Sequence, residues 1–516
     1  MFDNSIHLKI TGLYIKSRTV QIKLSALVCI LSLLFYACKT EEASVEQLVK
    51  NTCSSCHLFP EPNLLPKDIW LTQVLPNMAF RMGLVDLMDG LVYVPQQDLL
   101  TVIGTLPKER MVNEDEWAQI VNYYQTKSPD TLPSIPEAKY VELNTQFTLA
   151  TYHNPSDDEP LVTLIKFDSL RQQLVYGTRH SKLIALDKNL NTTTELSLDS
   201  PPSAIEFSLA SNYLSLMGIM DPNDQEKGMV ITWNGLETLP IIDSLKRPVH
   251  IQMEDLNNDS RKDFIISAFG NYTGDLSVYE SQGGDRYKRH LLSALPGARM
   301  TVIKDVNHDS LPDIIALFTQ GDEQLTLFIN QGNFQFQSKV LLRFPSVYGS
   351  THFEVVDFDK DGNLDILYAN GDNSDYSQIL KPYHGIRLFR QTGEWKYEET
   401  WFAPLHGASK AIARDFDQDG DLDIVAIAYF PDFTSDARRN FVYYENKNNQ
   451  FTPNILPSTP KGRWIVMDVG DIDNDHDLDI FLGALNFNTK VPKVLSDEWL
   501  NHPVSVLILK NNLYAE

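Results

Sequence analysis

Five acidic loops with one spacing, D-x-[DN]-x-D-x-x-x-D, recur along the second half of this 516-residue chain. Their first aspartates lie 50, 52, 58 and 56 residues apart. A period of this length is typical of propellers and repeat arrays, in which each repeat forms one supersecondary unit. The repeated side chains are Asp255, Asn257, Asp259 and Asp263; Asp305, Asn307, Asp309 and Asp313; Asp357, Asp359, Asp361 and Asp365; Asp415, Asp417, Asp419 and Asp423; and Asp471, Asp473, Asp475 and Asp479.

The spacing within each loop predicts a metal site. Alternate side chains at positions one, three and five of a tight loop converge on one cation, and a backbone carbonyl at position seven and the Asp at position nine complete the shell. These donors are all hard oxygens, which Ca²⁺ prefers. A single acidic loop could be a solvated turn. Five loops in register favour up to five Ca²⁺ ions, because crowded carboxylates without cations would repel one another.

Each acidic loop is followed by an apolar strand and a hairpin, with no flanking helix. Residues 264–266, 314–316, 366–368, 424–426 and 480–482 follow the final aspartates, and residues 325–334 show the second strand and its turn. This unit resembles the FG-GAP/VCBS repeat of integrin-alpha-like propellers. The resemblance implies an all-β propeller with calcium-binding loops over residues 139–516.

Two further units match the strand pattern without the ligands, at residues 161–198 and 204–245. Together with the five acidic repeats they predict seven blades. The last blade lacks an outer strand after residues 504–509. Residues 143–150 are expected to supply it, so that the ring closes without a bare sheet edge.

A second motif lies near the other end of the chain, in the run Cys53-Ser54-Ser55-Cys56-His57. Two thiols at this spacing can add to the vinyl groups of a porphyrin, and the adjoining imidazole then lies under the iron. A redox dithiol is expected in a βαβ context, and half of a zinc site needs a second Cys or His pair. The sequence shows neither, which favours covalent haem c.

Residues 44–127 are predicted to form a small all-α domain around this motif. Its last helix, at residues 114–125, has one apolar face, and Asn113 is a plausible N-cap. The order of elements resembles a class I cytochrome c. The resemblance implies Cys53 and Cys56 as haem attachment points and His57 as an iron ligand. Residues 128–138 carry three prolines and are predicted to be a linker.

The sixth iron ligand is less well specified, because core packing is the commoner role of Met. Met78 is preferred, since Pro76 and Asn77 precede it. Another ligand or an open site remains an alternative, and the other candidate methionines are Met82, Met88 and Met111. A Met ligand would suit electron transfer by raising the reduction potential.

Residues 1–37 are predicted to be an export signal. The apolar run at 24–37 is too short to span a bilayer comfortably and follows several basic residues. The segment ending at Cys38 resembles a bacterial lipobox, which implies lipidation of Cys38 and a tether at 38–43. The expected location is the cell envelope, on either side of the outer membrane. An uncleaved N-terminal membrane anchor is the alternative.

A ring of basic and aromatic residues is expected at one end of the propeller channel. These residues lie shortly before the acidic loops: Arg247, His250, Arg299, His352, Lys410, Arg463 and Trp464. They could bind an anion, a sugar or a partner, or balance the neighbouring acidic loops. The net charge of −24 argues against nucleic acid as a partner.

The two motifs together predict a multi-domain, exported haem protein that carries electrons, with the propeller as a docking platform. Its partners would be a redox protein or a small electron donor or acceptor, with a carbohydrate or protein ligand on the propeller. One alternative is a haem-linked oxidoreductase acting on a sugar or alcohol. Another is a non-redox adhesion or scaffold protein. Enzymatic activity stays open, since no motif places a catalytic residue.

Overall fold

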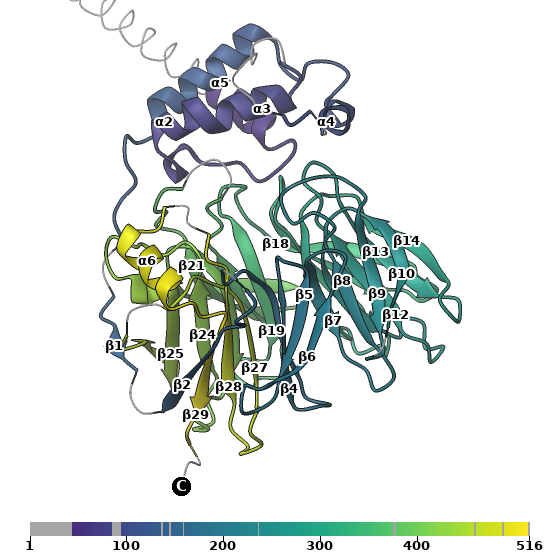
Figure 1. The fold of residues 1–516 in the computed structure, drawn as a ribbon. Helices are drawn as coiled ribbons and strands as arrows, with labels where there is room; N and C mark the ends of the chain where they lie inside the picture. The colour runs from purple at the N-terminus through teal and green to yellow at the C-terminus, as the bar shows by residue number, and fades with distance from the viewer. Residues whose placement is uncertain are drawn as a thin grey trace, which may run out of the picture.

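The computed structural model describes residues 44–84, 94–96, 98–135, 138–143, 146–157, 159–235, 237–374, 378–458, 461–487 and 490–513. Figure 1 shows a helical part at the top and a propeller below it. The expected export signal, Cys38, the tether and Met88 lie outside the described residues. Within the described part of the chain, no helix has the length and apolarity that a membrane span needs.

The helical part begins with a helix over residues 44–53. It continues with η1 (Pro62–Leu64), α2 (Lys67–Ile69), the π-turn η2 (Trp70–Val74), α3 (Leu75–Arg81), α4 (Leu99–Thr105) and α5 (Glu114–Lys127). The predicted N-cap of the last helix is confirmed. The Asn113 side chain accepts a hydrogen bond from the Glu116 N–H at 2.9 Å, and the Glu116 carboxylate accepts one from the Asn113 N–H at 2.9 Å. This reciprocal pair satisfies two N–H groups that have no partner inside the helix.

Two aromatic rings form the centre of the helical core. The rings of Trp70 and Tyr124 lie 4.5 Å apart, and both are almost fully buried. Their polar atoms hold the loop that follows the Cys pair. The Trp70 indole N–H donates to the Pro62 carbonyl at 2.9 Å, and the Tyr124 hydroxyl donates to the Pro60 carbonyl at 2.8 Å. Each ring thus buries apolar area without leaving its polar atom unpaired.

The rest of the chain is built from short strands. In chain order these are β1 (Val141–Glu142), β2 (Phe147–Tyr152), β3 (Val162–Asp168), β4 (Gln173–Thr178), β5 (Lys182–Leu186), β6 (Thr192–Ser197), β7 (Pro202–Glu206), β8 (Asn212–Leu216), β9 (Gly228–Trp233), β10 (Thr238–Leu245), β11 (Pro248–Glu254), β12 (Asp263–Ala268), β13 (Asp275–Ser281), β14 (Tyr287–Ser293), β15 (Ala298–Lys304), β16 (Asp313–Phe318), β17 (Gln324–Asn330), β18 (Phe336–Arg343), β19 (Ser350–Val356), β20 (Asp365–Asn370), β21 (Gly385–Gly393), β22 (Lys396–Pro404), β23 (Ala408–Arg414), β24 (Asp423–Ala428), β25 (Phe441–Lys447), β26 (Gln450–Ile455), β27 (Trp464–Gly470), β28 (Asp479–Ala484) and β29 (Val506–Asn511). The short η4 (Ala437–Asn440) precedes β25, and α6 (Lys493–Asn501) lies between β28 and β29.

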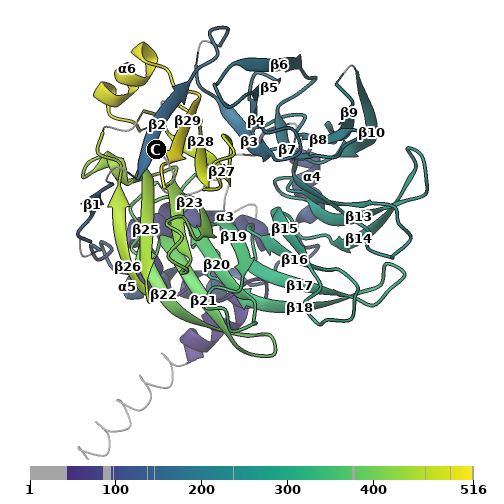
Figure 2. The same ribbon diagram turned by 90° about the horizontal axis from the view of Figure 1, so that it is seen from below.

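These strands form seven antiparallel sheets arranged as blades around an axis, as Figure 2 shows. The innermost strands β3, β7, β11, β15, β19, β23 and β27 contact one another in turn, and β27 returns to β3. The second strands are buried on both faces, because neighbouring blades cover them. In β12, β16, β20, β24 and β28 every residue is buried. Their continuous apolar sequences follow from this position.

The seventh blade is closed by a strand from before the first blade. β2 pairs antiparallel with β29, from Phe147 opposite Asn511 to Tyr152 opposite Val506. The closing strand predicted from the sequence, at residues 143–150, begins four residues before β2 and overlaps its first part. Leu143 instead donates its N–H to the Ile455 carbonyl at 2.8 Å, beside β1, which pairs parallel with β26 of the sixth blade. The segment therefore contacts two blades in succession.

Every innermost strand has a register shift at its second residue, where one residue is left unpaired with the next strand. Such bulges redirect the side chain that they carry. Three of the bulge residues have hydroxyl groups that donate to the following blade. Thr163 bonds to the Pro202 carbonyl at 2.7 Å, Ser203 to Pro248 at 2.8 Å and Thr351 to Ala408 at 3.1 Å.

The helical part rests on the propeller face at which the innermost strands begin (Figure 1). The Tyr383 hydroxyl donates to the Leu64 carbonyl at 3.0 Å, and the Arg81 guanidinium lies 4.5 Å from the Tyr272 ring centroid. Val347 and Ile379 of the propeller pack against the helical core. All four propeller residues lie in loops at this face, so the opposite face is left to the acidic loops.

Candidate functional site

The five predicted acidic loops all lie at one kind of turn. Each joins the end of an innermost strand to the start of the second strand, in blades three to seven. The loops therefore share one face of the propeller, and the helical part lies at the other. The structure places the predicted residues in these turns, and each ninth aspartate begins the strand that follows.

One backbone conformation is repeated in all five loops. The fourth and sixth residues have positive φ angles in each case, with values of 59° and 66° at Asn258 and Ser260. The sixth residue is Gly only at Gly362 and Gly420; elsewhere it is Ser260, Ser310 or His476. A left-handed backbone is costly for residues with a side chain. At the sixth position, three of the five loops therefore hold a residue with a side chain in a conformation that suits glycine.

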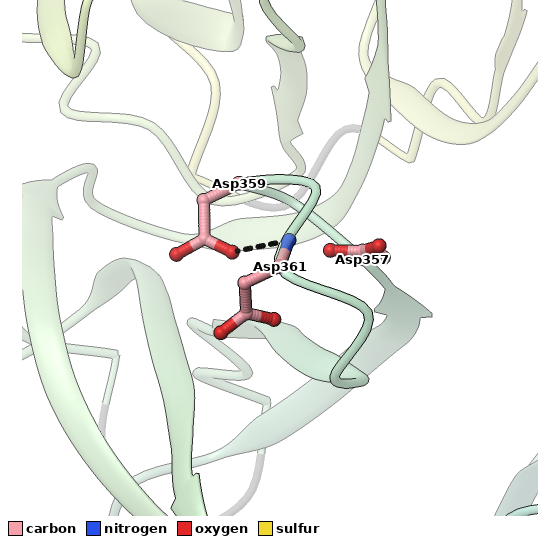
Figure 3. A group of neighbouring side chains, drawn as sticks. All are labelled: Asp357, Asp359 and Asp361. Carbon is pink, nitrogen blue, oxygen red and sulfur yellow. Dashed lines mark hydrogen bonds between the residues drawn. The ribbon is translucent and has the colours of Figure 1, made fainter.

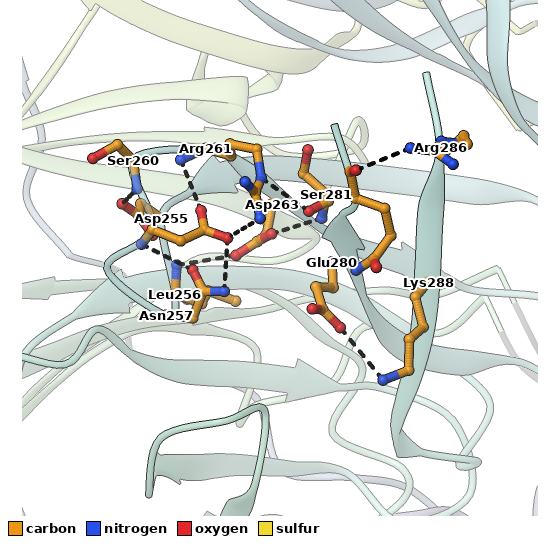
Figure 4. A network of polar contacts seen from close by, with 12 residues as sticks. Asp255, Leu256, Asn257, Ser260, Arg261, Asp263, Glu280, Ser281, Arg286 and Lys288 are labelled. Atoms are coloured by element: carbon orange, nitrogen blue, oxygen red, sulfur yellow. Dashed lines mark hydrogen bonds and ion pairs between the residues drawn. The ribbon is translucent and has the colours of Figure 1, made fainter. Parts of the chain in front are cut away.

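The first aspartate of each loop organises the turn (Figure 4). In the first loop one Asp255 oxygen accepts the Asp259 N–H at 3.0 Å, and the other accepts the Ser260 N–H at 2.7 Å. The same pattern recurs at Asp305 and Asp471. These bonds draw the backbone around the carboxylate, which keeps the alternate side chains on the inside of the turn.

The ninth aspartate joins the loop to the sheet. Asp263 is fully buried, and its two oxygens accept the Leu256 N–H at 3.1 Å and the Ser281 N–H at 2.9 Å. The equivalent residues Asp313, Asp365, Asp423 and Asp479 make the same two kinds of bond. The ninth aspartate therefore has a structural role even without a cation, in addition to the ligand role that the sequence predicted.

Three loops bring three carboxylates within 4.8 Å of one another. They are Asp357, Asp359 and Asp361, drawn in Figure 3; Asp415, Asp417 and Asp423; and Asp471, Asp473 and Asp479. In the first two loops Asn257 and Asn307 occupy the third position, so fewer carboxylates meet there.

Several oxygens in these triads are buried without a hydrogen-bond partner in the described part of the chain. They belong to Asp357, Asp415 and Asp473. Buried polar atoms are nearly always paired, so an unpaired carboxylate oxygen beside two other carboxylates fits a cation ligand. The donors are all oxygens on a flexible loop, which suits Ca²⁺ better than a soft metal.

The sequence missed an additional carboxylate in the last loop. Asp477 occupies position seven, where a backbone carbonyl was expected to be the donor, and its side chain is fully buried. One of its oxygens accepts the Leu513 N–H at 3.1 Å and the other has no described partner. Burial, followed by the nearby Asp475, raises the pKa of Asp477 to about 6. Its place in the alternating run of aspartates is the signal that could have found it.

Burial also raises the pKa of Asp423 and of Asp479 to about 7 in the cation-free chain. Desolvation disfavours the charged form of a carboxylate, and like charges add to the effect. A divalent cation at the same place would lower these pKa values. Without a cation, the charged carboxylates of the acidic loops therefore destabilise the fold by desolvation and mutual repulsion.

The residues of the Cys53–His57 motif lie at the end of the first helix, which finishes at residue 53. Both cysteines are free thiols. Cys53 packs against the helical core, and burial raises its pKa to about 11, whereas Cys56 is exposed. The His57 Nδ1 lies 2.9 Å from the Leu58 carbonyl, which can only accept. Nδ1 must then carry the proton, which leaves the Nε2 lone pair free for a metal.

The candidate sixth ligands differ in their surroundings. Met78 and Met82 pack, half-buried, against the same core as Cys53. Met111 is 42% exposed. Cys53, Met78 and Met82 therefore share one core.

The ring of basic and aromatic residues is divided by the structure. Arg247 lies over the Phe269 ring and donates to the Met220 carbonyl at 2.9 Å, and Arg463 lies 4.0 Å from the Tyr429 ring centroid and donates to the Tyr429 carbonyl at 2.7 Å. Trp464 is fully buried. These three residues support the loops between blades. His250, Arg299, His352 and Lys410 remain at the axis.

A groove of about 610 Å³ lies beside the second and third acidic loops. It is lined by Trp395 at the tip of the β21–β22 hairpin and by polar groups that include Asn307, His308, Asp361 and Asn363. Its size is within the range of small-molecule sites. An indole edge with amide and carboxylate groups offers both stacking and hydrogen bonds to a ligand.

Comparison with known proteins identifies the repeats. Residues 305–368 and 415–482 match the family described as FG-GAP-like repeat. No curated protein matches this chain. The chain thus carries FG-GAP-like repeats within a seven-bladed β-propeller, as the sequence predicted.

Solved structures with some similarity include the N-terminal domain of Nup159, at 10% identity and a TM-score of 0.42, covering 73% of this chain and 99% of that one. The Neurospora crassa Pan2 WD40 domain is 10% identical with a TM-score of 0.43, covering 71% and 97%. The WD40 propeller domain of Doa1 is 13% identical with a TM-score of 0.40, covering 72% and 99%. Similarity at this level carries no information about function.

Proposed function

We propose that this protein is an exported electron carrier whose helical domain holds one covalent haem c and whose propeller, stabilised by Ca²⁺, is a docking platform. One observation carries the proposal. The thiols of Cys53 and Cys56 are unpaired at the end of a helix, and Cys53 packs against the same core as the thioether of Met78. No second Cys or His pair for a zinc site lies in the described helical residues.

The residues of the motif would have separate roles. Each thiol adds across one vinyl group, with its hydrogen passing to the neighbouring carbon, so two thioethers form without a change of oxidation state. His57 supplies Nε2, with Nδ1 held by the Leu58 carbonyl. Met78 is the preferred sixth ligand. The bound iron supplies one-electron chemistry, and the protein sets its potential and access.

The propeller contributes rigidity and a surface. Up to five Ca²⁺ ions would bind the acidic loops, with the three triads as the strongest sites because they gather three carboxylates each. The groove beside Trp395 is the place where a carbohydrate or protein ligand would bind. The net charge of −24 favours a basic redox partner and argues against nucleic acid. Lipidation at Cys38 would hold the protein at the outer membrane.

The proposal is tested by making the protein in a host with haem maturation machinery. We expect a c-type absorption spectrum that survives denaturation and an intact mass increased by one haem. Cys53→Ala with Cys56→Ala should remove both. Met78→Ala should change the low-spin spectrum, whereas the matched variant Met111→Ala should not. A colourless product with unmodified thiols would contradict the haem assignment.

A redox titration separates the electron-carrier function from the alternatives. Addition of candidate sugars or alcohols to the oxidised protein should leave the haem oxidised. Reduction by such a substrate would instead assign an oxidoreductase. A reduced haem that exchanges electrons with no small cytochrome or oxidant would favour an adhesion or scaffold protein.

A further inference from the structure

Four basic side chains from consecutive blades lie on the innermost strands, around the propeller axis. They are His250 of β11, Arg299 of β15, His352 of β19 and Lys410 of β23, each on the second or third residue of an innermost strand. All four remain partly accessible to water although they lie among the innermost strands. They therefore border a water-accessible space at the axis.

Electrostatic effects between distant blades support this arrangement. Lys166 of β3, Lys410 and Arg299 all lower the pKa of His250, in addition to burial, which brings it to about 3. Lys410, Arg299 and His250 likewise lower the pKa of His352. These groups belong to blades one, three, four, five and six. Effects among blades that are not neighbours, such as that of Lys166 on His250, are consistent with side chains that surround one axis.

The cations of this cluster have no carboxylate in direct contact. In the part of the chain that the structure describes, no carboxylate lies within ion-pair distance of Arg299 or Lys410. Carboxylates act on them only from a longer distance: Asp372 on Arg299, and Asp468 and Glu354 on Lys410. The last two carboxylates also have other partners. Asp468 accepts the Phe167 N–H at 2.8 Å and lies 3.7 Å from Lys166, and Glu354 pairs with Arg414 at 2.5 Å.

This lack of a direct ion pair has a cost. Burial lowers the pKa of Lys410 to about 8 and also lowers that of Arg299. Desolvated cations without partners are destabilising. Although the net charge of the protein is −24, neither cation has a direct ion pair among the described residues. An anionic ligand would supply that partner.

Arg299 differs from its counterparts in the other blades. It occupies the bulge position, where the hydroxyl groups of Thr163, Ser203 and Thr351 bond to the following blade. Arg299 makes a longer bond of this kind, from Nε to the Thr351 carbonyl at 3.4 Å. Among the residues that the structure describes, the other guanidinium nitrogens have no acceptor, and the bulge directs them away from the regular ladder.

His250 is prepared to donate a hydrogen bond. Its Nδ1 accepts the Thr301 N–H at 3.3 Å, so the proton of the neutral ring lies on Nε2. The site thus offers a planar guanidinium fork, an ammonium group and an imidazole N–H. This is a set of donors with two positive charges and no acceptor, which suits a small oxyanion.

We propose that Arg299, Lys410, His250 and His352 form an axial site for a small dianionic oxyanion, a phosphate, sulfate or dicarboxylate group. The anion supplies the missing ion-pair partner and accepts hydrogen bonds from all four side chains. The site lies in the first half of the innermost strands, on the side of the propeller that carries the helical domain. It is independent of haem and of the acidic loops.

The test is calorimetric titration of the calcium-loaded protein with sulfate, succinate and acetate. Sulfate is used in place of phosphate because it does not precipitate calcium at low millimolar concentration. We expect saturable binding of one dianion, with acetate at least tenfold weaker. A preference for sulfate assigns a tetrahedral inorganic-type group, and a preference for succinate assigns a dicarboxylate. Absence of saturable binding of either dianion overturns the proposal.

Two variants localise the site. Lys410→Met should weaken binding at least tenfold, whereas the matched charge removal Lys396→Met, on the exposed outer strand β22, should change it less than twofold. Arg299→Thr restores the hydroxyl residue found in other blades. It should abolish binding and raise the melting temperature in anion-free buffer. A higher melting temperature would show that the variant is folded, so misfolding would not explain the lost binding. Unchanged affinity in Arg299→Thr would contradict the proposal.

Discussion

The hydroxyl group of Tyr383 donates a hydrogen bond to the backbone carbonyl of Leu64 at 3.0 Å, and so joins the propeller to the helical domain. The same tyrosine ring stacks on Tyr348, with ring centroids 4.8 Å apart. The helical domain is therefore held in one orientation on the propeller rather than only tethered by the linker at 128–138.

Loss of this bond should loosen the helical domain. Tyr383→Phe removes the hydroxyl and should cost about 0.5–1.5 kcal/mol of docking free energy. The measurement is amide hydrogen exchange, which should become several-fold faster over residues 58–66. Tyr397→Phe, which removes a half-buried hydroxyl on the outer strand β22, is the control and should leave that exchange unchanged.

The acidic loops should respond to calcium removal in two distinguishable ways. Asp417→Asn alters a ligand of the fourth loop, so it should lower stability in calcium by up to about 2.7 kcal/mol at a hundredfold excess over Kd. In chelator the same variant should be no less stable than the wild type, because it relieves repulsion among carboxylates. Thermal unfolding with and without EDTA is the measurement.

Asp423→Asn should behave differently. Asp423 accepts the Phe416 N–H, the Asn446 N–H and the Tyr443 hydroxyl at 3.1, 2.8 and 2.8 Å. An amide cannot accept at both positions, so the variant should lose about 1–3 kcal/mol in chelator as well as in calcium. Asp285→Asn, at an exposed hairpin, is the control in both buffers. Equal behaviour of the Asp417 and Asp423 variants would show that the ninth aspartate has no separate structural role.

Glycine at the sixth loop position should stabilise the protein. Ser310 has a φ of 71° there, where Gly420 has 101°. Ser310→Gly should gain about 0.5–1 kcal/mol, since the left-handed backbone costs about 1–2 kcal/mol and the added chain entropy offsets part of it. Gly420→Ser should have the opposite effect. A Cβ at Gly420 meets no atom within 4 Å, so the cost comes from the left-handed backbone alone and not from a steric clash. Chemical denaturation in chelator separates this effect from calcium affinity.

The axial histidines should make stability depend on pH. The folded pKa of His250 is lowered to about 3 by burial and by Lys166, Lys410 and Arg299, while that of an unfolded histidine is about 6.5. The unfolded chain therefore binds the proton more tightly. The contribution of neutral His250 is complete above about pH 6.5 and is lost as the pH falls from there toward 3.

Comparison with His250→Gln isolates this contribution from other titrating groups. The free energy of unfolding of the wild type relative to this variant should fall as the pH is lowered from 6.5 to 4. Saturating sulfate should make that fall shallower, because an anion at the axis favours the charged ring. A difference that does not vary with pH would show that His250 is not desolvated.

The loops and second strands could be predicted because their signal lies in strict local spacing. In the run from Asp415 to Asp423, for example, each repeated aspartate has a fixed place in the turn, so the sequence spacing alone identifies the loop. The closing strand was predicted at residues 143–150 and lies at Phe147–Tyr152, because its bounds are set by the pairing with β29. The helix α6 was missed, since it is a short insertion anchored mainly by the buried Trp499.

The axial cluster shows the limit of sequence reasoning in another way. Arg247 and Arg299 occur at similar distances before their loops, yet one stacks on Phe269 and the other faces the axis. Arg247 lies just before β11, whereas Arg299 is the second residue of β15, at the bulge. A difference of two residues in the distance to the acidic loop therefore decides the surroundings of each arginine. The haem motif remains a prediction from residue chemistry, supported by the hydrogen bond that leaves Nε2 of His57 available.

The pairing of β2 with β29 has a consequence for biosynthesis. During translation, six sheets can assemble from consecutive hairpins, but β2 has no partner until residues 506–511 have been made. A contact between segments so distant in sequence is expected to form late and slowly. A nascent or prematurely terminated chain thus presents an open arc with unsatisfied peptide groups, which chaperones or proteases can recognise until the circle is complete.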